Sequence, residues 1–152
     1  MSDKLIIYTD GGCRRNPGPA AIGVVIQDIS GTTLATISRY IGPGTNNQAE
    51  YRAVIAGLEE ACLLKANSVE IRADSQLIVE QLNGRYKVKD ASLRPLCQEA
   101  QNLGRRFRSF SIRYIPREMN READRLAGQA LDKQAVTNPA PDFIVRQTSL
   151  NL

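Results

Sequence analysis

The order of β-rich and helical segments is the feature that most constrains the fold of this chain. Three β-rich runs, at residues 4–10, 21–28 and 32–41, precede the first helical pattern, and strands and helices alternate after it. An antiparallel meander followed by α/β crossovers is typical of a mixed sheet flanked by helices. We therefore predict an α/β fold. Its further segments are strands at 68–73 and 109–115 and helices at about 46–64, 75–82, 93–107 and 120–131.

The connection through the first long helix determines how the strands are arranged. A right-handed crossover places the fourth strand beside the first, which predicts a five-stranded sheet in the order 3-2-1-4-5. Ligand sites in such sheets form at the carboxyl ends of strands where the winding reverses. Asp10 and Asp74 end the first and fourth strands. Because adjacent strands lie about 4.8 Å apart, we expect both carboxylates to face one site.

Length and composition narrow the class of protein. The 152 residues indicate one domain, which we place at 1–131, followed by a tail at 132–152. No apolar run approaches the roughly 18 residues of a membrane helix and no leader is evident, so we expect a soluble, cytoplasmic monomer without an obligatory protein partner. Three cysteines without C-x-x-C spacing favour free thiols. The chain has no histidine, which excludes Ser-His and Cys-His catalytic pairs.

The positive charge is concentrated in one stretch. Of twenty lysines and arginines, ten lie between Arg85 and Arg121 among only three acidic residues, so this stretch carries +7 and the rest of the chain −3. Such a separation suits a protein that holds a polyanion on one surface and metal ions in carboxylates on another. An ordinary solvated helix face is the alternative.

Four acidic residues are candidates for one site, although each has a structural alternative. Asp10 precedes a glycine, as in a common turn, and Asp74 precedes a helical segment, as an N-cap does. Glu50 follows Asn47 by three residues, the capping-box spacing. Asp124 lies beside the apolar stripe of the last helix, where surface residues also lie. Together, two strand-end aspartates and two residues from first helical turns are expected to reach one edge of the sheet.

Clustered carboxylates repel one another unless cations neutralise their charge. Ligands that are all oxygen atoms select hard ions such as Mg²⁺ or Mn²⁺, and two such ions about 3.5–4 Å apart form the clamp used in phosphodiester hydrolysis. This chemistry needs no histidine, serine or cysteine nucleophile, in agreement with the composition. The acidic residues therefore predict a metal-dependent phosphodiester hydrolase.

Four spaced motifs resemble type 1 ribonuclease H, in the order found in that family. They are YTDGGCRRNPGPAAIGVVI at 8–26, TNNQAEYRAVIAGLEEA at 45–61, EIRADSQLIVEQLNG at 70–84 and YIPREMNREADRLAGQA at 114–130. The resemblance covers about residues 4–131 and implies the RNase H-like fold. It also implies an endoribonuclease that cuts the RNA strand of RNA/DNA hybrids and leaves 5′-phosphate and 3′-hydroxyl ends.

The resemblance also implies roles for individual residues. Asp10 would bridge two Mg²⁺ or Mn²⁺ ions, Glu50 and Asp74 would hold the ion near the leaving group, and Asp124 would hold the ion near the attacking water. Main-chain groups and amides beside the carboxylates would read the RNA 2′-OH. The positions that match the family's substrate contacts are Cys13, Asn16, Asn46 and Gln76, with Thr45 for phosphate contact and Asn47 for loop shaping. Turns and helix caps are the alternative roles of these residues.

The chain departs from the family pattern where many members carry a basic helical protrusion. No such protrusion is evident here, and the loop with Tyr86, Lys87 and Lys89 is the candidate to replace it. The tyrosine would stack on the substrate and the lysines would face the DNA backbone. A plain exposed loop is the alternative.

A second departure is the missing mobile-loop histidine of the family. Arg117 occupies that region. Since arginine does not act as a base, it would attract the product phosphate or stabilise developing charge. Pairing with Glu118 or Glu122 is the alternative role.

A function of another class stays open, because a module that binds hybrid or double-stranded RNA without cutting it would need the same basic surface. An acidic pocket facing phosphate gives such a binder no advantage, so the four carboxylates favour the nuclease. Resolvases and transposases share the fold and act on DNA. The Asn-Pro-Gly loop and the amide positions favour the hybrid instead.

Overall fold

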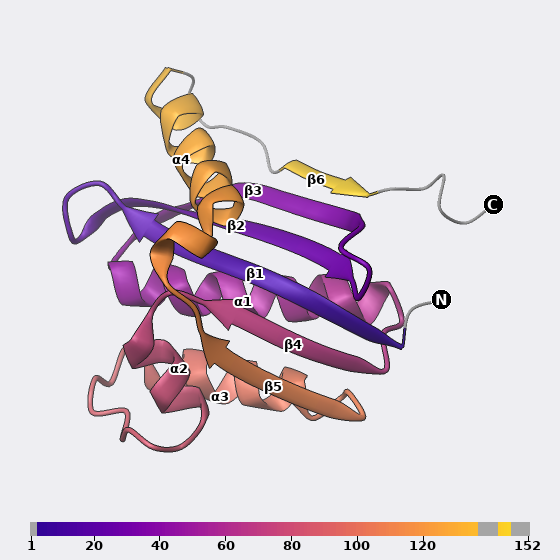
Figure 1. The fold of residues 1–152 in the computed structure, drawn as a ribbon. Helices are drawn as coiled ribbons and strands as arrows, with labels where there is room; N and C mark the ends of the chain where they lie inside the picture. Colours follow the sequence, from indigo (N-terminus) through magenta and orange to yellow (C-terminus); the bar gives the residue numbers. More distant parts are fainter. Residues whose placement is uncertain (1–2, 137–142, 147–152) are drawn as a thin grey trace.

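A mixed six-stranded sheet forms the centre of the computed structural model, which describes residues 3–136 and 143–146 (Figure 1). The antiparallel meander consists of β1 (Lys4–Cys13), β2 (Gly18–Asp28) and β3 (Thr33–Gly44). The parallel part adds β4 (Ser68–Ala73) beside β1 and β5 (Ser109–Tyr114) beside β4. The other elements are α1 (Asn46–Leu63), α2 (Gln76–Leu82), α3 (Arg94–Gly104), the short 3₁₀ helix η1 (Arg117–Met119), α4 (Arg121–Val136) and β6 (Phe143–Arg146).

The strand order is β5-β4-β1-β2-β3-β6, which confirms the predicted α/β fold and the order of its first five strands. The prediction of five strands is wrong by one, because β6 pairs antiparallel with β3. Arg146 of β6 also donates from Nη2 to Oε1 of Glu60 on α1, at 2.7 Å. Both β6 and the last turn of α4 lie in the segment expected as a tail. The division of the chain at residue 131 stays a prediction.

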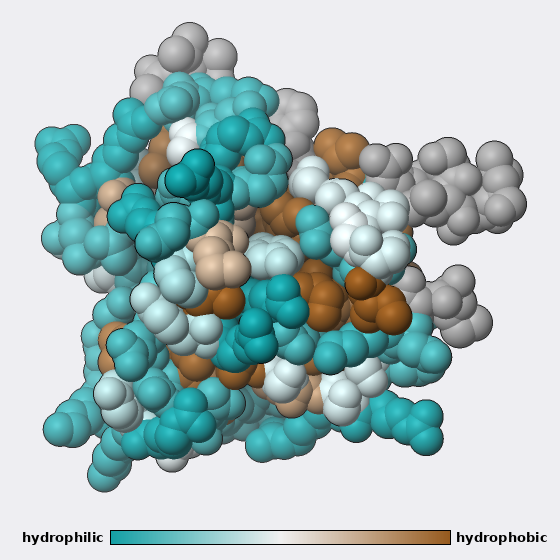
Figure 2. Space-filling view, viewed as in Figure 1, coloured by the Kyte–Doolittle hydropathy of each residue, from teal (hydrophilic) through white to brown (hydrophobic). Residues whose placement is uncertain are grey.

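The helices cover both faces of the sheet (Figure 1). A Cβ added to Gly57 of α1 would lie 2.9 Å from the Ile7 side chain, so this helix packs closely on one face. On the other face α4 crosses β2, where a Cβ on Gly23 would lie 1.9 Å from the Ala123 carbonyl oxygen. Figure 2 shows this second face, which is mostly hydrophilic with small apolar patches. No helix in the described part of the chain has the length and apolarity to cross a membrane.

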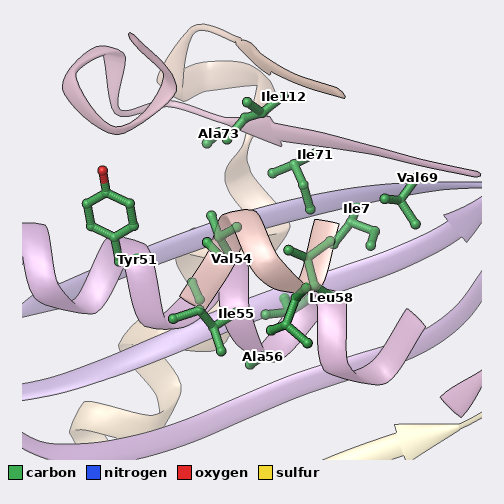
Figure 3. Close-up of a cluster of buried hydrophobic side chains, with 14 of the residues drawn as sticks. Ile7, Tyr51, Val54, Ile55, Ala56, Leu58, Val69, Ile71, Ala73 and Ile112 are labelled. Atoms are coloured by element: carbon green, nitrogen blue, oxygen red, sulfur yellow. The ribbon is translucent and has the colours of Figure 1, made fainter. Parts of the chain in front are cut away.

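The main core lies between the sheet and α1 (Figure 3). Tyr51, Val54 and Leu58 of α1 are at most 1% exposed, as are Ile7 of β1 and Ile71 of β4. Burial of one such side chain contributes roughly 1.5–3 kcal/mol. This layer holds α1 rigidly against the two strands that carry Asp10 and Asp74.

The expected end of the first strand at Asp10 is wrong, and the difference defines the site. β1 pairs with β4 only as far as Thr9 opposite Ala73. It stays paired with β2 as far as Cys13 opposite Ala20. Asp10 is therefore the first residue of β1 beyond its parallel neighbour, next to the point where β4 ends.

Candidate active site

Asp10 and Asp74 lie side by side at the edge formed by the end of β4. Each directly follows one member of the last β1–β4 pair, Thr9 and Ala73. The topology thus places both carboxylates together, as predicted from the crossover. Gly11 comes next on β1, and a Cβ there would lie 2.3 Å from the backbone carbonyl of Ala49. Only glycine lets the strand pass this close to α1.

Glu50 reaches the same edge from α1. The N-cap of this helix is Thr45, whose Oγ1 accepts from the Gln48 N–H at 3.1 Å while the Gln48 side chain accepts from the Thr45 N–H at 2.9 Å. The expected cap at Asn46 or Asn47 is therefore wrong, and Glu50 is neither a capping-box residue nor in the first turn. Its Oε1 instead accepts from the Gly11 N–H at 3.2 Å.

Carboxylate oxygens of Asp10, Glu50 and Asp74 lie within 4.8 Å of one another. We call these three residues the acidic trio. Asp10 is 8% exposed, and the other two are partly buried. One oxygen from each residue is therefore within reach of a shared cation.

Asp124 adjoins the acidic trio from the first turn of α4, as expected. Its carboxyl group interacts with Asp10, whose pKa it raises. The nearest oxygen of Asp124 also lies 3.6 Å from Nη2 of Arg117. Glu122, one of the two expected partners of Arg117, instead accepts a hydrogen bond from Nε of Arg125 at 3.1 Å. Arg117 is thus the cation next to the site, and its side chain is 79% exposed.

The electrostatics of the site favour protonated carboxyl groups. Burial, followed by the charge of Asp74 and contact with Asp124, raises the pKa of Asp10 to about 8. Burial and the charges of Asp10 and Asp74 raise the pKa of Glu50 well above its usual range. Burial also raises the pKa of Asp74. Arg117 lowers all three pKa values without cancelling these effects.

Three of the predicted substrate contacts form one hydrogen-bonded group beside the acidic trio. The Cys13 N–H donates to Oδ1 of Asn46 at 3.0 Å, and the Asn46 N–H donates to Oδ1 of Asn16 at 3.1 Å. The Cys13 thiol lies 3.3 Å from the same Asn46 oxygen. Asn16 and Asn46 are both exposed. Two amide side chains are thus oriented at the surface beside Asp10.

The remaining predicted substrate contacts do not form one group, because they lie on α1, on α2 and in the loop after α2. Thr45 caps α1, Asn47 is its second residue, and Gln76 is the exposed first residue of α2. Lys87 and Lys89 are exposed in the loop after α2, and Tyr86 in that loop is 48% exposed. No contact in the described part of the chain joins these three loop residues to the acidic trio.

Sequence reasoning missed the role of Asn120, which it treated only as the start of the last helix. Its Nδ2 donates to the Thr9 carbonyl at 2.8 Å and to Oδ2 of Asp74 at 3.1 Å. The side chain is 1% exposed. The available signal was an amide residue four positions before Asp124, on the same helix face as that carboxylate.

The donor set fits a hard divalent cation. Carboxylate oxygens are the ligands that Mg²⁺ and Mn²⁺ prefer, and the acidic trio supplies three. Burial and the charges of neighbouring carboxyl groups raise these pKa values, which leaves the ionised forms with a deficit of stabilising positive charge among the described residues. A bound cation would remove this deficit.

Comparison with known proteins agrees with this geometry. A family model described as reverse transcriptase-like matches residues 8–130. The bifunctional protein Rv2228c of Mycobacterium tuberculosis is 46% identical over 133 residues, which are 87% of this chain and 36% of that protein. Ribonuclease HI of Halobacterium salinarum is 45% identical over 129 residues, 85% of this chain and 65% of that enzyme. The chain therefore spans about a third of the first relative and just under two thirds of the second.

A solved structure supports the same grouping. LC11-RNase H1, in complex with an RNA/DNA hybrid, superimposes with a TM-score of 0.83 at 45% identity and covers 88% of this chain and 99% of its own. This match to a solved structure at 45% sequence identity confirms the expected fold. This chain belongs to the ribonuclease H family.

Proposed function

We propose that the protein is an endoribonuclease that hydrolyses the RNA strand of RNA/DNA hybrids. The observation that carries the proposal is the acidic trio at the sheet edge, with oriented amide groups beside it. Family membership supports the reaction, and the hybrid bound to LC11-RNase H1 supports the substrate class. The products would be a 5′-phosphate and a 3′-hydroxyl.

Two Mg²⁺ ions, or Mn²⁺ in their place, are the proposed cofactors. When bound, such ions activate the attacking water and neutralise charge on the leaving oxygen. Asp10 would contact both ions, Glu50 and Asp74 would hold one and Asp124 the other. The Gly11 N–H holds one oxygen of Glu50, which leaves the other available as a ligand.

Recognition of RNA is assigned to the group beside the acidic trio. The amides of Asn16, Asn46 and Gln76 and the backbone at Cys13 would contact 2′-hydroxyl groups, which only RNA offers. Thr45 would contact a phosphate, and Asn47 would shape the loop. The mutual hydrogen bonds of Cys13, Asn16 and Asn46 support this assignment, because they orient exposed polar groups before substrate arrives.

The basic residues are assigned to the backbone of the hybrid. Lys87 and Lys89 would face DNA phosphates and Tyr86 would stack, which their exposure permits. Arg117 would stabilise charge on the scissile phosphate, and its position 3.6 Å from Asp124 supports this role. Monomeric action in the cytoplasm, without a protein partner, completes the proposal.

The test is cleavage of an end-labelled RNA/DNA hybrid, with duplex DNA as the comparison substrate. We expect Mg²⁺-dependent cutting of the RNA strand and at least a hundredfold slower cutting of DNA, since DNA lacks the 2′-OH. Cleavage in excess EDTA would contradict the metal assignment. Equal cutting of DNA would contradict the substrate assignment. Tight binding of the hybrid without cleavage would favour the binding module instead.

A further inference from the structure

Asn120 connects three of the four elements that bring carboxylates to the site. Its two Nδ2 hydrogen bonds reach the Thr9 carbonyl on β1 and Oδ2 of Asp74 after β4. Its own carbonyl accepts from the Asp124 N–H at 3.1 Å, in the first turn of α4. One buried residue thus touches the backbone next to Asp10, the side chain of Asp74 and the backbone of Asp124.

The chemistry of these contacts requires an amide nitrogen. Both acceptors, a carbonyl and a carboxylate, lack a hydrogen to donate, so the side chain must present its NH₂ group to them. That group has two hydrogens, one for each acceptor. Oδ1 of Asn120 is buried on the other side and accepts no hydrogen bond from the described residues. An aspartate of the same shape would lose both donors.

We propose that Asn120 is a positioning residue that holds Asp74 in the orientation needed for cation binding. The inference rests on the proposed metal-dependent function and adds to it a residue outside the ligand set. By donating to Oδ2, the amide restricts the rotation of the carboxylate, and Oδ1 of Asp74 takes no hydrogen bond from Asn120. By donating to the Thr9 carbonyl at the same time, it sets the distance between Asp74 and β1.

The hydrogen bond from Asn120 to Asp74 favours the ionised form of the carboxyl group, in agreement with this role. Asp74 accepts a hydrogen bond from a neutral side-chain donor, Asn120, which lies 46 residues away in the sequence. A donor that favours the ionised carboxylate also favours the form that binds a cation. The contact therefore serves the metal-bound state as well as the fold.

The experiment measures Mn²⁺ binding calorimetrically without nucleic acid, below the unfolding temperature of each variant. Asn120→Ala should raise the dissociation constant about 10- to 100-fold, the range found when a partner of a metal ligand is lost. Asn83→Ala is the matched control, because Asn83 donates from Nδ2 to the Ile112 carbonyl at 3.1 Å and has no hydrogen bond to a carboxylate of the described residues. It should leave the dissociation constant unchanged.

A double-mutant cycle separates positioning from a merely structural role. In an Asp74→Asn background, Asn120→Ala should change Mn²⁺ affinity by less than about threefold, because the carboxylate through which it acts is already gone. Equal effects in both backgrounds would overturn the inference. Should Asn120→Ala not fold, Asn120→Leu fills a similar space and removes the donors without adding a charge, and the same comparison applies.

Hybrid cleavage by the wild-type protein is recorded alongside, so that the two proposals can fail separately. If the wild type neither binds Mn²⁺ nor cuts a hybrid, the proposed function fails and the inference with it. If the wild type does both and Asn120→Ala binds Mn²⁺ equally well, only the role of Asn120 is overturned.

Discussion

Glu70 and Asp74 lie four residues apart on and just beyond β4, and their surroundings are opposite. Glu70 accepts from Nε of Arg72 at 2.7 Å, with Nζ of Lys4 at 3.3 Å and Nε of Arg113 at 3.6 Å. Although burial acts against it, Arg72 and Lys4 lower the pKa of Glu70. Burial raises the pKa of Asp74.

The difference separates a carboxylate that serves the fold from carboxylates that serve a ligand. Arg72 also donates to the Tyr8 hydroxyl at 2.9 Å and lies over its ring, so the partners of Glu70 are built into the sheet. The acidic trio brings three carboxylates together, and among the described residues the exposed Arg117 is the cation whose charge acts on them. Within β4, Glu70 has cationic partners. At the end of the same strand, the carboxylates of the acidic trio have too little positive charge around them, which indicates a site for a cation.

The largest expected effect is on catalysis. Asp10→Asn and Asp74→Asn should each lower hybrid cleavage more than about 10³-fold, beyond the loss expected for one hydrogen-bond donor, because a charged ligand is removed. Glu70→Gln should cut at nearly the wild-type rate. Rates are measured under single-turnover conditions with saturating Mg²⁺. Comparable losses of cleavage rate in Asp10→Asn and Glu70→Gln would contradict the distinction between the acidic trio and Glu70.

The second effect is on the free energy of unfolding, whose dependence on pH has opposite signs for Asp10 and Glu70. Asp10 has an ordinary pKa of 3.8 and a folded pKa of about 8, so the folded state retains a proton that the unfolded state has lost. Without metal, stability should therefore fall as pH rises from about 4 to 8. Asp10→Asn should be more stable than wild type at pH 8 by a few kcal/mol, since each pKa unit corresponds to about 1.4 kcal/mol.

Urea unfolding in EDTA at pH 4, 6 and 8 measures this difference. The advantage of Asp10→Asn should grow with pH and nearly vanish at pH 4. Addition of Mg²⁺ at pH 8 should stabilise the wild type and leave Asp10→Asn nearly unchanged. A stability difference that stays constant across the pH range would show that ionisation of Asp10 does not destabilise the fold.

The third effect concerns Arg117, the cation next to the acidic trio among the described residues. Arg117→Ala should lower turnover about 10- to 10³-fold with little change in hybrid affinity, as for loss of one charge-stabilising group. Arg117→Lys should recover part of the rate. Arg125→Ala removes an exposed arginine of α4 that pairs with Glu122, and it is the control for lost surface charge. Equal turnover of Arg117→Ala and Arg125→Ala would make Arg117 an ordinary surface residue.

The smallest effect is that of Glu70 on stability. Its folded pKa lies below the usual value, so it stabilises the fold above about pH 4.5, and this contribution is lost as pH falls through the folded pKa. Glu70→Gln should cost about 1 kcal/mol or less at pH 7, as expected for ion pairs whose cations are partly exposed, and nothing at pH 3. A variant more stable than wild type at pH 7 would contradict the assignment of Glu70 to the fold.

The sequence predicted the parts of the site that depend on strand topology. The right-handed crossover alone brings Asp10 beside Asp74, and the β1–β4 register bears this out. The cap of α1 was wrong, because Thr45, Asn46 and Asn47 are all good caps and only the entering backbone decides among them.

Two other features depend on contacts between distant segments. β6 has only four residues, and its place follows from pairing with β3 and from the ion pair between Arg146 and Glu60. The role of Asn120 depends on acceptors more than 45 residues away, at Thr9 and Asp74. Local patterns carry no information about such partners.

Proton release on metal binding tests most directly the claim that the acidic trio is a cation-binding site. Mn²⁺ is titrated calorimetrically into the protein at pH 7, in two buffers of different ionisation enthalpy. Because Asp10 has a pKa of about 8 without metal, binding should release a proton, and the observed heat should differ between the buffers. Asp10→Asn should lose both the tight binding and the release, whereas Glu70→Gln should keep both. Binding of equal affinity in Asp10→Asn, or identical heats in the two buffers for the wild type, would contradict the account.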